Sequence, residues 1–270
     1  IFSTGAGVPI KRSSDLLTWT DEGRVFATNP EWIAQAVPGA TNLWAPDIAH
    51  FGALYHLYYS ASTFGSRNSC IGHATATDLS AMDFVDHGPI ICTTETDDYN
   101  AIDPGVVLDE DGTPWLSFGS FWTGIKLIRL DADGARDGPE LHALASRDAV
   151  GAIEAPYLIR RGDYYYLFVS FDLCCRGTAS TYRVMVGRST DVTGPYVDRT
   201  GKPMLSSGGG TQVVLGDQRW RGPGHNAVLT DGDAQYLVYH AYDASNGGVA
   251  TLRILELLWD SAGWPIPAGP

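Results

Sequence analysis

Short apolar runs, rather than long amphipathic stretches, dominate the hydrophobic pattern of this chain. Runs rich in Tyr, Phe, Val, Leu and Ile recur along the 270 residues between clusters of Gly, Asp, Asn and Pro, whereas helical periodicity is scarce. This pattern is typical of many short antiparallel strands joined by turns. We therefore predict an all-β fold and, at this length, a single domain over residues 1–270.

One strand pattern repeats along the chain. Each version is an aromatic or aliphatic run that ends in small or polar residues, and such an internal repeat indicates an architecture of equivalent units. A radial array of four-stranded blades, a β-propeller, brings the first strands of all blades around one axis. The five versions are IFSTG (1–5), LYYSAS (57–62), LSFGS (116–120), LFVSF (167–171) and LVYHA (237–241).

Four polar residues stand at nearly the same place before four of these repeats. Each lies close to a proline and leads into the first strand of its unit. In a propeller these strand starts converge, so we expect the four side chains to approach one another. They are Asp47, Asp103, Glu154 and His225, which lie 13, 16, 16 and 15 positions before Ser60, Gly119, Ser170 and His240.

Paired carboxylates at such strand starts suit glycoside hydrolysis. Two carboxylates in a partly desolvated funnel have their pKa values pushed apart, so that one stays protonated as a general acid. In an inverting enzyme the second carboxylate lies about 6.5 to 9.5 Å from the first and activates a water molecule held between it and the sugar. Asp103 and Glu154 precede their prolines, whereas Asp47 follows one, so we interpret Asp47 as structural. Structural caps at all of these strand starts are the alternative.

Several motifs occur in an order that resembles the five-bladed β-propeller endo-arabinanases of glycoside hydrolase family 43. The resemblance covers essentially the whole chain and implies an inverting, secreted hydrolase that cleaves internal α-1,5-linked L-arabinofuranosyl bonds of arabinan, a polysaccharide of plant cell walls. The motifs are LWAPDI (43–48), AIDPGVV (101–107), SFGSFWTGIKLI (117–128), AIEAPYLI (152–159), SFDLCCRGTASTY (170–182), MVGRS (185–189) and GPGHN (222–226).

The resemblance also implies roles for three residues. Glu154 would be the general acid, and Asp103 would orient it and tune its pKa. His225 would lie beside a bound calcium ion that is coordinated largely by water. The family carries its catalytic base as an Asp on the first strand of the first blade, and by the internal spacing that residue falls before Ile1. We therefore expect the first blade to lack its innermost strand, and the sequence to be N-terminally incomplete relative to the family.

Contacts to the substrate are expected from two kinds of side chain. Trp44, Phe121 and Trp122 belong to loops at the same end as the acids, where aromatic faces stack on sugar rings, and packing between blades is the alternative for them. Polar contacts to sugar hydroxyl groups are expected from Asn100, Ser180 and Tyr182.

The four cysteines match neither paired zinc-binding spacing nor a dense disulfide framework, and they leave the redox compartment open. Adjacent cysteines are too constrained to pair readily with each other. We therefore interpret Cys174 and Cys175 as packing residues.

Charge excludes some partners. Lys and Arg number 18 against 31 Asp and Glu, a net charge of -13 that argues against nucleic acid and anionic membranes. No apolar run reaches the roughly 18 residues of a membrane span, and no signal-peptide pattern opens the chain.

Two alternatives to the endo-arabinanase stay open. One is an exo-acting arabinofuranosidase or β-xylosidase of the same fold, although the chain ends directly after its last repeat, with no room for the β-sandwich domain of many xylosidases. The other is a sugar-binding propeller without catalysis.

Overall fold

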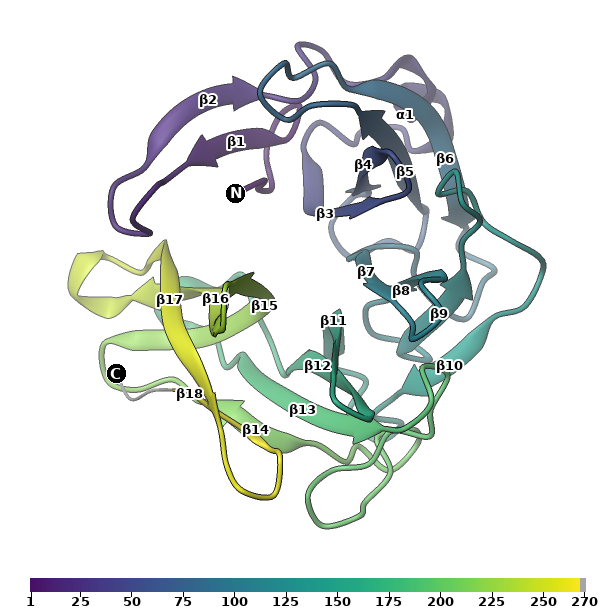
Figure 1. The fold of residues 1–270 in the computed structure, drawn as a ribbon. Helices are drawn as coiled ribbons and strands as arrows, with labels where there is room; N and C mark the ends of the chain where they lie inside the picture. The colour runs from purple at the N-terminus through teal and green to yellow at the C-terminus, as the bar shows by residue number, and fades with distance from the viewer. Residues whose placement is uncertain (268–270) are drawn as a thin grey trace. The chain divides into compact units, whose positions relative to one another are not determined.

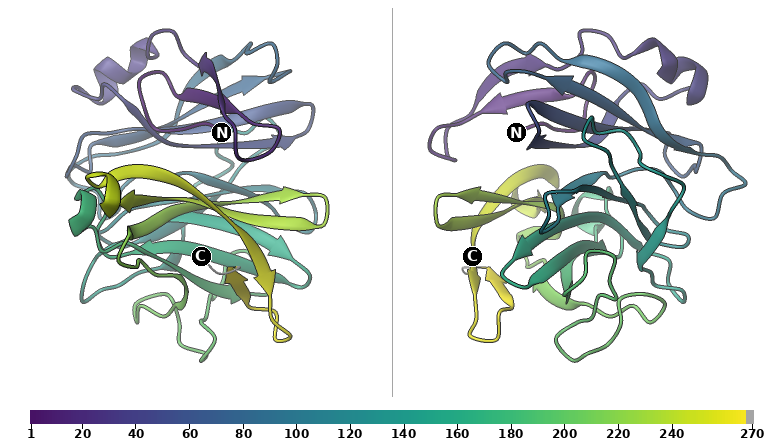
Figure 2. Two further views of the ribbon diagram at one scale, coloured as in Figure 1. Left: turned by 90° about the vertical axis from the view of Figure 1, so that its left-hand side faces the viewer. Right: turned by 45° about the vertical axis from the view of Figure 1, so that its right-hand side comes forward.

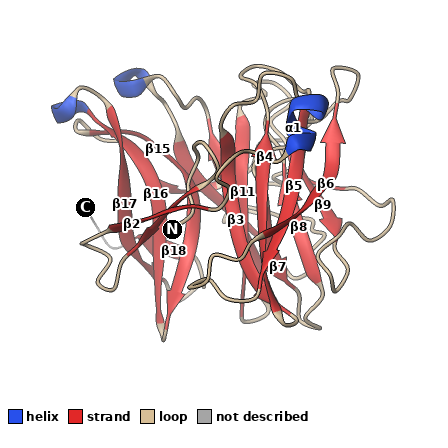
Figure 3. Cartoon of the chain, turned by 90° about the horizontal axis from the view of Figure 1, so that it is seen from above, coloured by secondary structure: helices blue, strands red, loops and turns tan. Residues whose placement is uncertain are grey.

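Strands make up almost all of the regular structure in the computed structural model, which describes residues 1–267 (Figures 1 and 3). The chain divides into two compact units. Unit 1 comprises Ile1–Trp122 and Lys126–His142, and unit 2 comprises Thr123–Ile125 and the residues from Ala143 onward. No helix in the described range is long and apolar enough to cross a membrane.

The first sheet of unit 1 has two strands, β1 (Pro9–Arg12) and β2 (Thr20–Arg24), which pair antiparallel. Phe2 forms an isolated bridge with Ile10, so the first residues of the chain run along the free edge of β1. The short helix α1 (Glu31–Ala36) follows and buries Ile33. This sheet agrees with the expected first blade that lacks its innermost strand.

The second sheet of unit 1 has the order β3-β4-β5-β6. A glycine with φ of 60°, Gly52, makes the tight turn between its first two strands, a conformation that glycine adopts without steric cost. A disulfide joins Cys70 to Cys92 across its last two strands. The strands are β3 (Leu43–Phe51), β4 (Leu54–Ala61), β5 (Ser69–Ala76) and β6 (Val85–Thr93).

The third sheet has the order β10-β9-β8-β7. Boundaries between the two units fall within β9 and β10. Leu116 and Phe118 from this sheet pack with Tyr58 and Ile71 from the second sheet in one buried cluster. Burial of such large side chains is the main stabilising contribution to the fold. The strands are β7 (Gly105–Leu108), β8 (Pro114–Phe118), β9 (Ile125–Arg129) and β10 (His142–Ala145).

Unit 2 contains two four-stranded sheets, of order β11-β12-β13-β14 and β15-β16-β17-β18. Phe168 of one sheet and Leu237 and Leu257 of the other share a buried cluster. Figure 2 shows the twist of β17 across the last sheet. The elements are β11 (Ile153–Arg161), β12 (Tyr164–Phe171), η1 (Gly177–Ala179), β13 (Arg183–Ser189), β14 (Thr211–Val214), β15 (Trp220–Asp231), β16 (Ala234–Asp243), η2 (Ala244–Asn246), β17 (Val249–Trp259) and β18 (Pro265–Pro267).

The first strands of three sheets share one irregularity at the same place. A β-bulge follows Trp44 in β3, Glu154 in β11 and Gly224 in β15, where the pairing register shifts. The residue after each of these three has a positive φ, 45° at Ala45, 54° at Ala155 and 51° at His225. Bulges of this kind redirect side chains and are frequent beside active sites.

The prediction for the adjacent cysteines is wrong. Cys174 and Cys175 form a disulfide with each other in the loop between β12 and β13. The backbone turns at Cys175, where φ is 66°, and this allows neighbouring side chains to approach. Both cysteine pairs of the chain are therefore oxidised, and the described residues include no free cysteine.

Candidate active site

Glu154 begins the first sheet of unit 2, where it pairs with Ser170 of β12. Its side chain is half-buried, and Oε1 accepts a hydrogen bond from the hydroxyl group of Tyr182. Tyr182 is only 1% exposed, and its ring lies against Gly224. A Cβ atom at Gly224 would come within 2.1 Å of that ring, so the glycine makes the space in which Tyr182 reaches the carboxylate.

His225 lies close enough to Glu154 for the carboxylate charge to act on its imidazole. Burial lowers the pKa of His225, and the charge of Glu154 opposes that effect. The backbone N–H of His225 donates to Oγ of Ser170, 2.8 Å away, so the strand partner of Glu154 also positions His225. The structure thus brings Glu154, Tyr182 and His225 together within unit 2.

Unsatisfied polar atoms occur beside this cluster. His240, whose ring centroid is 6.1 Å from that of Tyr182, has its pKa lowered to about 4 by burial, and its Nε2 is buried without a hydrogen-bond partner. Both amide atoms of Asn226 are also buried without one. Buried polar atoms in native structures are nearly always satisfied, so these atoms indicate a place for water or an ion.

The donor set near His225 fits a cation held largely by water. Asn226 offers an amide oxygen, and His225 offers a neutral imidazole. Within residues 1–267, no group of three His, Cys, Asp or Glu side chains is placed to hold a metal ion. Since calcium takes six to eight oxygen ligands, water would have to supply most of the coordination shell.

The loop from Asp172 to Tyr182 carries two predicted site residues and is tied down at its ends. Asp172 forms ion pairs with Arg147 at 2.8 Å and with Arg183 at 2.9 Å. Ser180 is buried, and its hydroxyl oxygen accepts a hydrogen bond from the backbone N–H of Arg176 at 3.0 Å. Both predicted substrate contacts of this loop, Ser180 and Tyr182, therefore have hydroxyl groups engaged within the protein.

Asp103 lies in unit 1, two residues before the start of β7. It is 7% exposed, has a φ of 61°, and its backbone N–H donates to Oγ of Ser60 at 2.9 Å. Its positive φ and its hydrogen bond to a serine of the repeated strand match those of His225. Because Asp103 belongs to unit 1 and Glu154 to unit 2, their expected convergence stays a prediction.

Asn100 lies three residues before Asp103. Its side chain is buried, and its Nδ2 donates to the backbone oxygen of Ser66 over 3.4 Å. Its Oδ1 is buried without a hydrogen-bond partner. An acceptor in that state is suited to a hydroxyl group of a ligand.

The bulge in β3 separates Asp47 from Trp44. Asp47 lies beyond the bulge, opposite Tyr58, and its Oδ2 accepts a hydrogen bond of 2.8 Å from the backbone N–H of Val106. Burial raises the pKa of Asp47 to about 7. The hydrogen bond links β3 to β7 and supports the structural interpretation of this acid.

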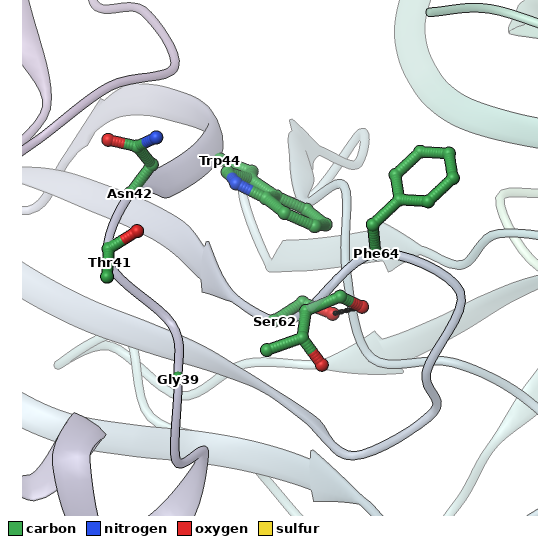
Figure 4. Close-up of a pocket in the computed structure, with 7 residues that line it drawn as sticks. Gly39, Thr41, Asn42, Trp44, Ser62 and Phe64 are labelled. Carbon is green, nitrogen blue, oxygen red and sulfur yellow. Dashed lines mark hydrogen bonds between the residues drawn. The ribbon is translucent and has the colours of Figure 1, made fainter.

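A cavity of about 160 Å³ opens beside Trp44 in unit 1 (Figure 4). Phe64, which is 85% exposed, lines it with Trp44, and the polar side chains of Asn42 and Ser62 contribute donors and acceptors. Phe64 is a candidate that the sequence analysis missed. The available signal was its place just after the repeated strand LYYSAS, where Phe121 and Trp122 follow LSFGS.

Phe121 and Trp122 form a second aromatic pair in unit 1. Both have positive φ, 55° and 43°, and their rings meet edge to face with centroids 6.5 Å apart. Trp122 is partly exposed, and the guanidinium group of Arg67 lies 5.2 Å from the centroid of its ring. The pair therefore offers an aromatic surface on which the ring of Trp122 is partly exposed.

Comparison with known proteins places the chain among carbohydrate-active enzymes. The sequence profile described as "Glycosyl hydrolases family 43" matches residues 1–265. The extracellular endo-α-(1→5)-L-arabinanase 1 of Bacillus subtilis is 46% identical over 96% of this chain and 79% of its own length. The extracellular exo-α-(1→5)-L-arabinofuranosidase ArbA of Cellvibrio japonicus is 43% identical over 98% of this chain and 81% of its own.

A solved structure agrees with the sequence comparison. The α-L-arabinanase of Cellvibrio cellulosa, solved with arabinohexaose, superposes with a TM-score of 0.93 at 42% identity, covering 99% of this chain and 90% of that one. The predicted all-β propeller, with its incomplete first blade, is confirmed.

Proposed function

The chain belongs to glycosyl hydrolase family 43, and on this premise we propose that it is an inverting endo-1,5-α-L-arabinanase that cleaves internal bonds of arabinan. The observation that carries the proposal is its 46% identity to an endo-arabinanase over 96% of its length. A half-buried carboxyl group at the start of β11, held by a buried tyrosine, is the matching geometry.

Glu154 is the proposed general acid. It donates a proton to the oxygen of the leaving sugar, while Tyr182 fixes the direction in which the carboxyl group points. Asp103 is the proposed modulator, because its negative charge would favour the protonated form of a neighbouring acid. We assign the base that activates water to no residue of this chain.

Aromatic side chains are the proposed contacts to the sugar rings. Trp44 and Phe64 line the same cavity and present ring faces, and Phe121 and Trp122 present a second surface. Asn100 is the proposed hydrogen-bonding partner for a sugar hydroxyl group, since its buried Oδ1 has no partner within the described protein.

We propose further that a calcium ion binds beside His225 and that the protein is secreted. The unsatisfied amide oxygen of Asn226 and the imidazole of His225 would contribute to its shell, and the ion would fix the backbone next to Glu154. Secretion is supported by the extracellular relatives and by the two disulfides, which persist in oxidising compartments.

Exo-acting cleavage is the second candidate, favoured by the 43% identity to an exo-arabinofuranosidase. The two modes differ in their products from linear arabinan. An endo enzyme releases a mixture of oligomers and lowers the viscosity early, whereas an exo enzyme releases one product from the chain end and leaves the viscosity high. Product analysis in the first minutes of reaction decides between them.

The assignment of the acid is tested by Glu154→Gln in the full-length protein. Glutamine keeps the shape of the side chain but delivers no proton, so cleavage of arabinan should fall by roughly 10² to 10⁴ fold. An arabinoside with an activated leaving group needs little protonation and should lose much less rate. Glu256→Gln, on the exposed face of β17, is the matched control. Wild-type turnover of arabinan by the Glu154 variant would place the acid elsewhere.

A further inference from the structure

The Cys174–Cys175 disulfide lies at the same end of its sheet as Glu154. Glu154 pairs with Ser170 near the end of β12, and the loop that carries the disulfide begins at Asp172. Cys175 is exposed and Cys174 is half-buried. The disulfide therefore meets solvent at the end of the sheet where the proposed chemistry takes place.

Hydrogen bonds fix the backbone on both sides of the disulfide. The N–H of Cys175 donates to the hydroxyl group of Tyr242 at 2.9 Å, which attaches the loop to β16. Leu173 and Thr181 close the base of the loop with two hydrogen bonds, from Thr181 N–H to the Leu173 carbonyl at 2.8 Å and from Leu173 N–H to Thr181 Oγ1 at 3.2 Å. The loop is thus held at its base and at its tip.

Two glycines allow the rest of the loop to lie flat on the last sheet. A Cβ atom at Gly222 would come within 2.4 Å of Cβ of Ser180, and one at Gly248 within 3.0 Å of the backbone nitrogen of Thr178. Both glycines also have a positive φ, 53° and 76°, so a side chain at either position would be strained. The exposed residues of the loop include Cys175, Arg176, Thr178 and Ala179, and Cys174 is half-buried. The disulfide and the side chain of Arg176 therefore form one continuous part of its exposed surface.

This surface has the chemistry of a small sugar site. The paired sulfur atoms are polarisable and apolar, and the five-membered ring of a furanose presents C–H groups that favour such a surface. Arg176 carries five N–H donors for hydroxyl groups beside it. An apolar surface with a few polar groups at its rim is the usual composition of a ligand site.

We propose that Cys174, Cys175 and Arg176 form a subsite that binds an arabinofuranosyl unit of the substrate away from the cleaved bond. The inference rests on the proposed function, since only a polymeric substrate extends beyond the acid. The disulfide makes the subsite stiff, so a sugar ring is bound with little ordering of the protein. Its contribution grows with substrate length, and a short substrate does not use it.

The test is a comparison of substrate lengths. The double variant Cys174→Ser/Cys175→Ser removes the disulfide without leaving a thiol. We expect KM for arabinohexaose to rise roughly fivefold, the loss expected for about 1 kcal/mol of binding, with KM for arabinotriose changed much less. Arg176→Ala, which leaves the disulfide in place, should change KM in the same direction and keeps the test valid if the double variant folds poorly.

The other disulfide provides the matched control. Cys70→Ser/Cys92→Ser removes a crosslink within a sheet of unit 1 and should lower the melting temperature without changing the dependence of KM on length. Equal changes in KM for short and long substrates, or none in either variant of the loop, would overturn the subsite. A wild-type protein that cleaves no linear arabino-oligosaccharide would instead contradict the proposed function, and the subsite with it.

Discussion

The hydroxyl group of Tyr182 donates a hydrogen bond to Oε1 of Glu154. A donor to a carboxylate stabilises its charged form, so Tyr182→Phe should let Glu154 keep its proton to higher pH. We expect the alkaline limb of the pH profile for arabinan cleavage to move upward, and kcat to fall roughly tenfold as the carboxyl group loses its fixed direction. A profile that keeps both limbs unmoved would show that the tyrosine only fills space.

Gly224 controls the same contact through packing. In Gly224→Ala the new methyl group would meet the ring of Tyr182 at 2.1 Å, and the ring would have to shift away from Glu154. Overpacking of this kind costs about 1 to 3 kcal/mol of unfolding free energy. Activity should fall with stability, as measured by chemical denaturation and arabinan cleavage. Gly232→Ala is the control: the turn has open space, but φ is 59°, so the variant loses stability through backbone strain alone while activity should persist.

Asp47 gives a stability that depends on pH. Its pKa of about 7 lies above the ordinary value of 3.8, so the folded state holds a proton that the unfolded state releases between these pH values. Stability contributed by this group is therefore lost as the pH rises from about 4 to about 7. Asp47→Asn keeps an oxygen for the N–H of Val106 and carries no charge.

The expected result for Asp47→Asn is a higher melting temperature at pH 8, by about 2 to 4 °C. At about pH 3 both side chains are mostly neutral in the folded and the unfolded state, and the difference should vanish. A melting temperature that drops at both pH values would mean that the carboxylate makes a further contact that an amide cannot replace.

The buried histidines of the second sheet have the opposite dependence. Burial lowers the pKa of His73 to about 3 and lowers that of His56, and the two rings hydrogen-bond at 3.1 Å. Below pH 6.5 these imidazoles bind protons in the unfolded state but stay neutral in the folded state. The free energy of unfolding therefore falls on acidification. Between pH 7 and pH 4.5 the loss should reach about 2 to 3 kcal/mol for His73.

His73→Gln keeps a polar partner for His56 and does not titrate in this range. Denaturation midpoints at pH 7 and pH 4.5 should therefore differ less in the variant than in the wild type. Equal losses in the two proteins would exclude His73 as the group that takes up the proton.

Removal of the proposed cation should lower the stability of the protein, and this effect should depend on His225. A ligand that binds only the native state stabilises it by mass action, so a chelator should lower the melting temperature of the wild type, and calcium should restore it. His225→Ala should lower stability and activity together and respond less to the chelator. A melting temperature that the chelator leaves unchanged would remove the ion from the proposal.

The repeat could be predicted because strand register preserves it. Ser60, Ser170 and His240, which the sequence aligns, are the partners of Trp44, Glu154 and Gly224 across the first two strands of their sheets. Two strands joined by a tight turn have nearly the same number of residues between cross-strand partners in every sheet. A constant spacing along the sequence therefore corresponds to a constant pairing across the strands.

Other features depend on backbone conformations, such as a positive φ, that cannot be predicted from the residue types. The positive φ of Ala45 is unusual for alanine, and the bulge it belongs to places Asp47 differently from Glu154 although both lie near a proline. The disulfide between Cys174 and Cys175 depends likewise on the turn at Cys175. Phe64 becomes a candidate only when the loop after β4 places it beside Trp44.

The shared bulge keeps the same backbone pairing in three sheets, whatever side chain stands just before it. Trp44, Glu154 and Gly224 hold equivalent positions, yet one is an aromatic, one an acid and one a space for a neighbouring ring. The strand pairing is the same with each of these three residues. The side chain at this position can therefore change from sheet to sheet while the backbone pairing stays the same. The same tolerance offers an engineer a position at which to install a second acid without rebuilding a strand.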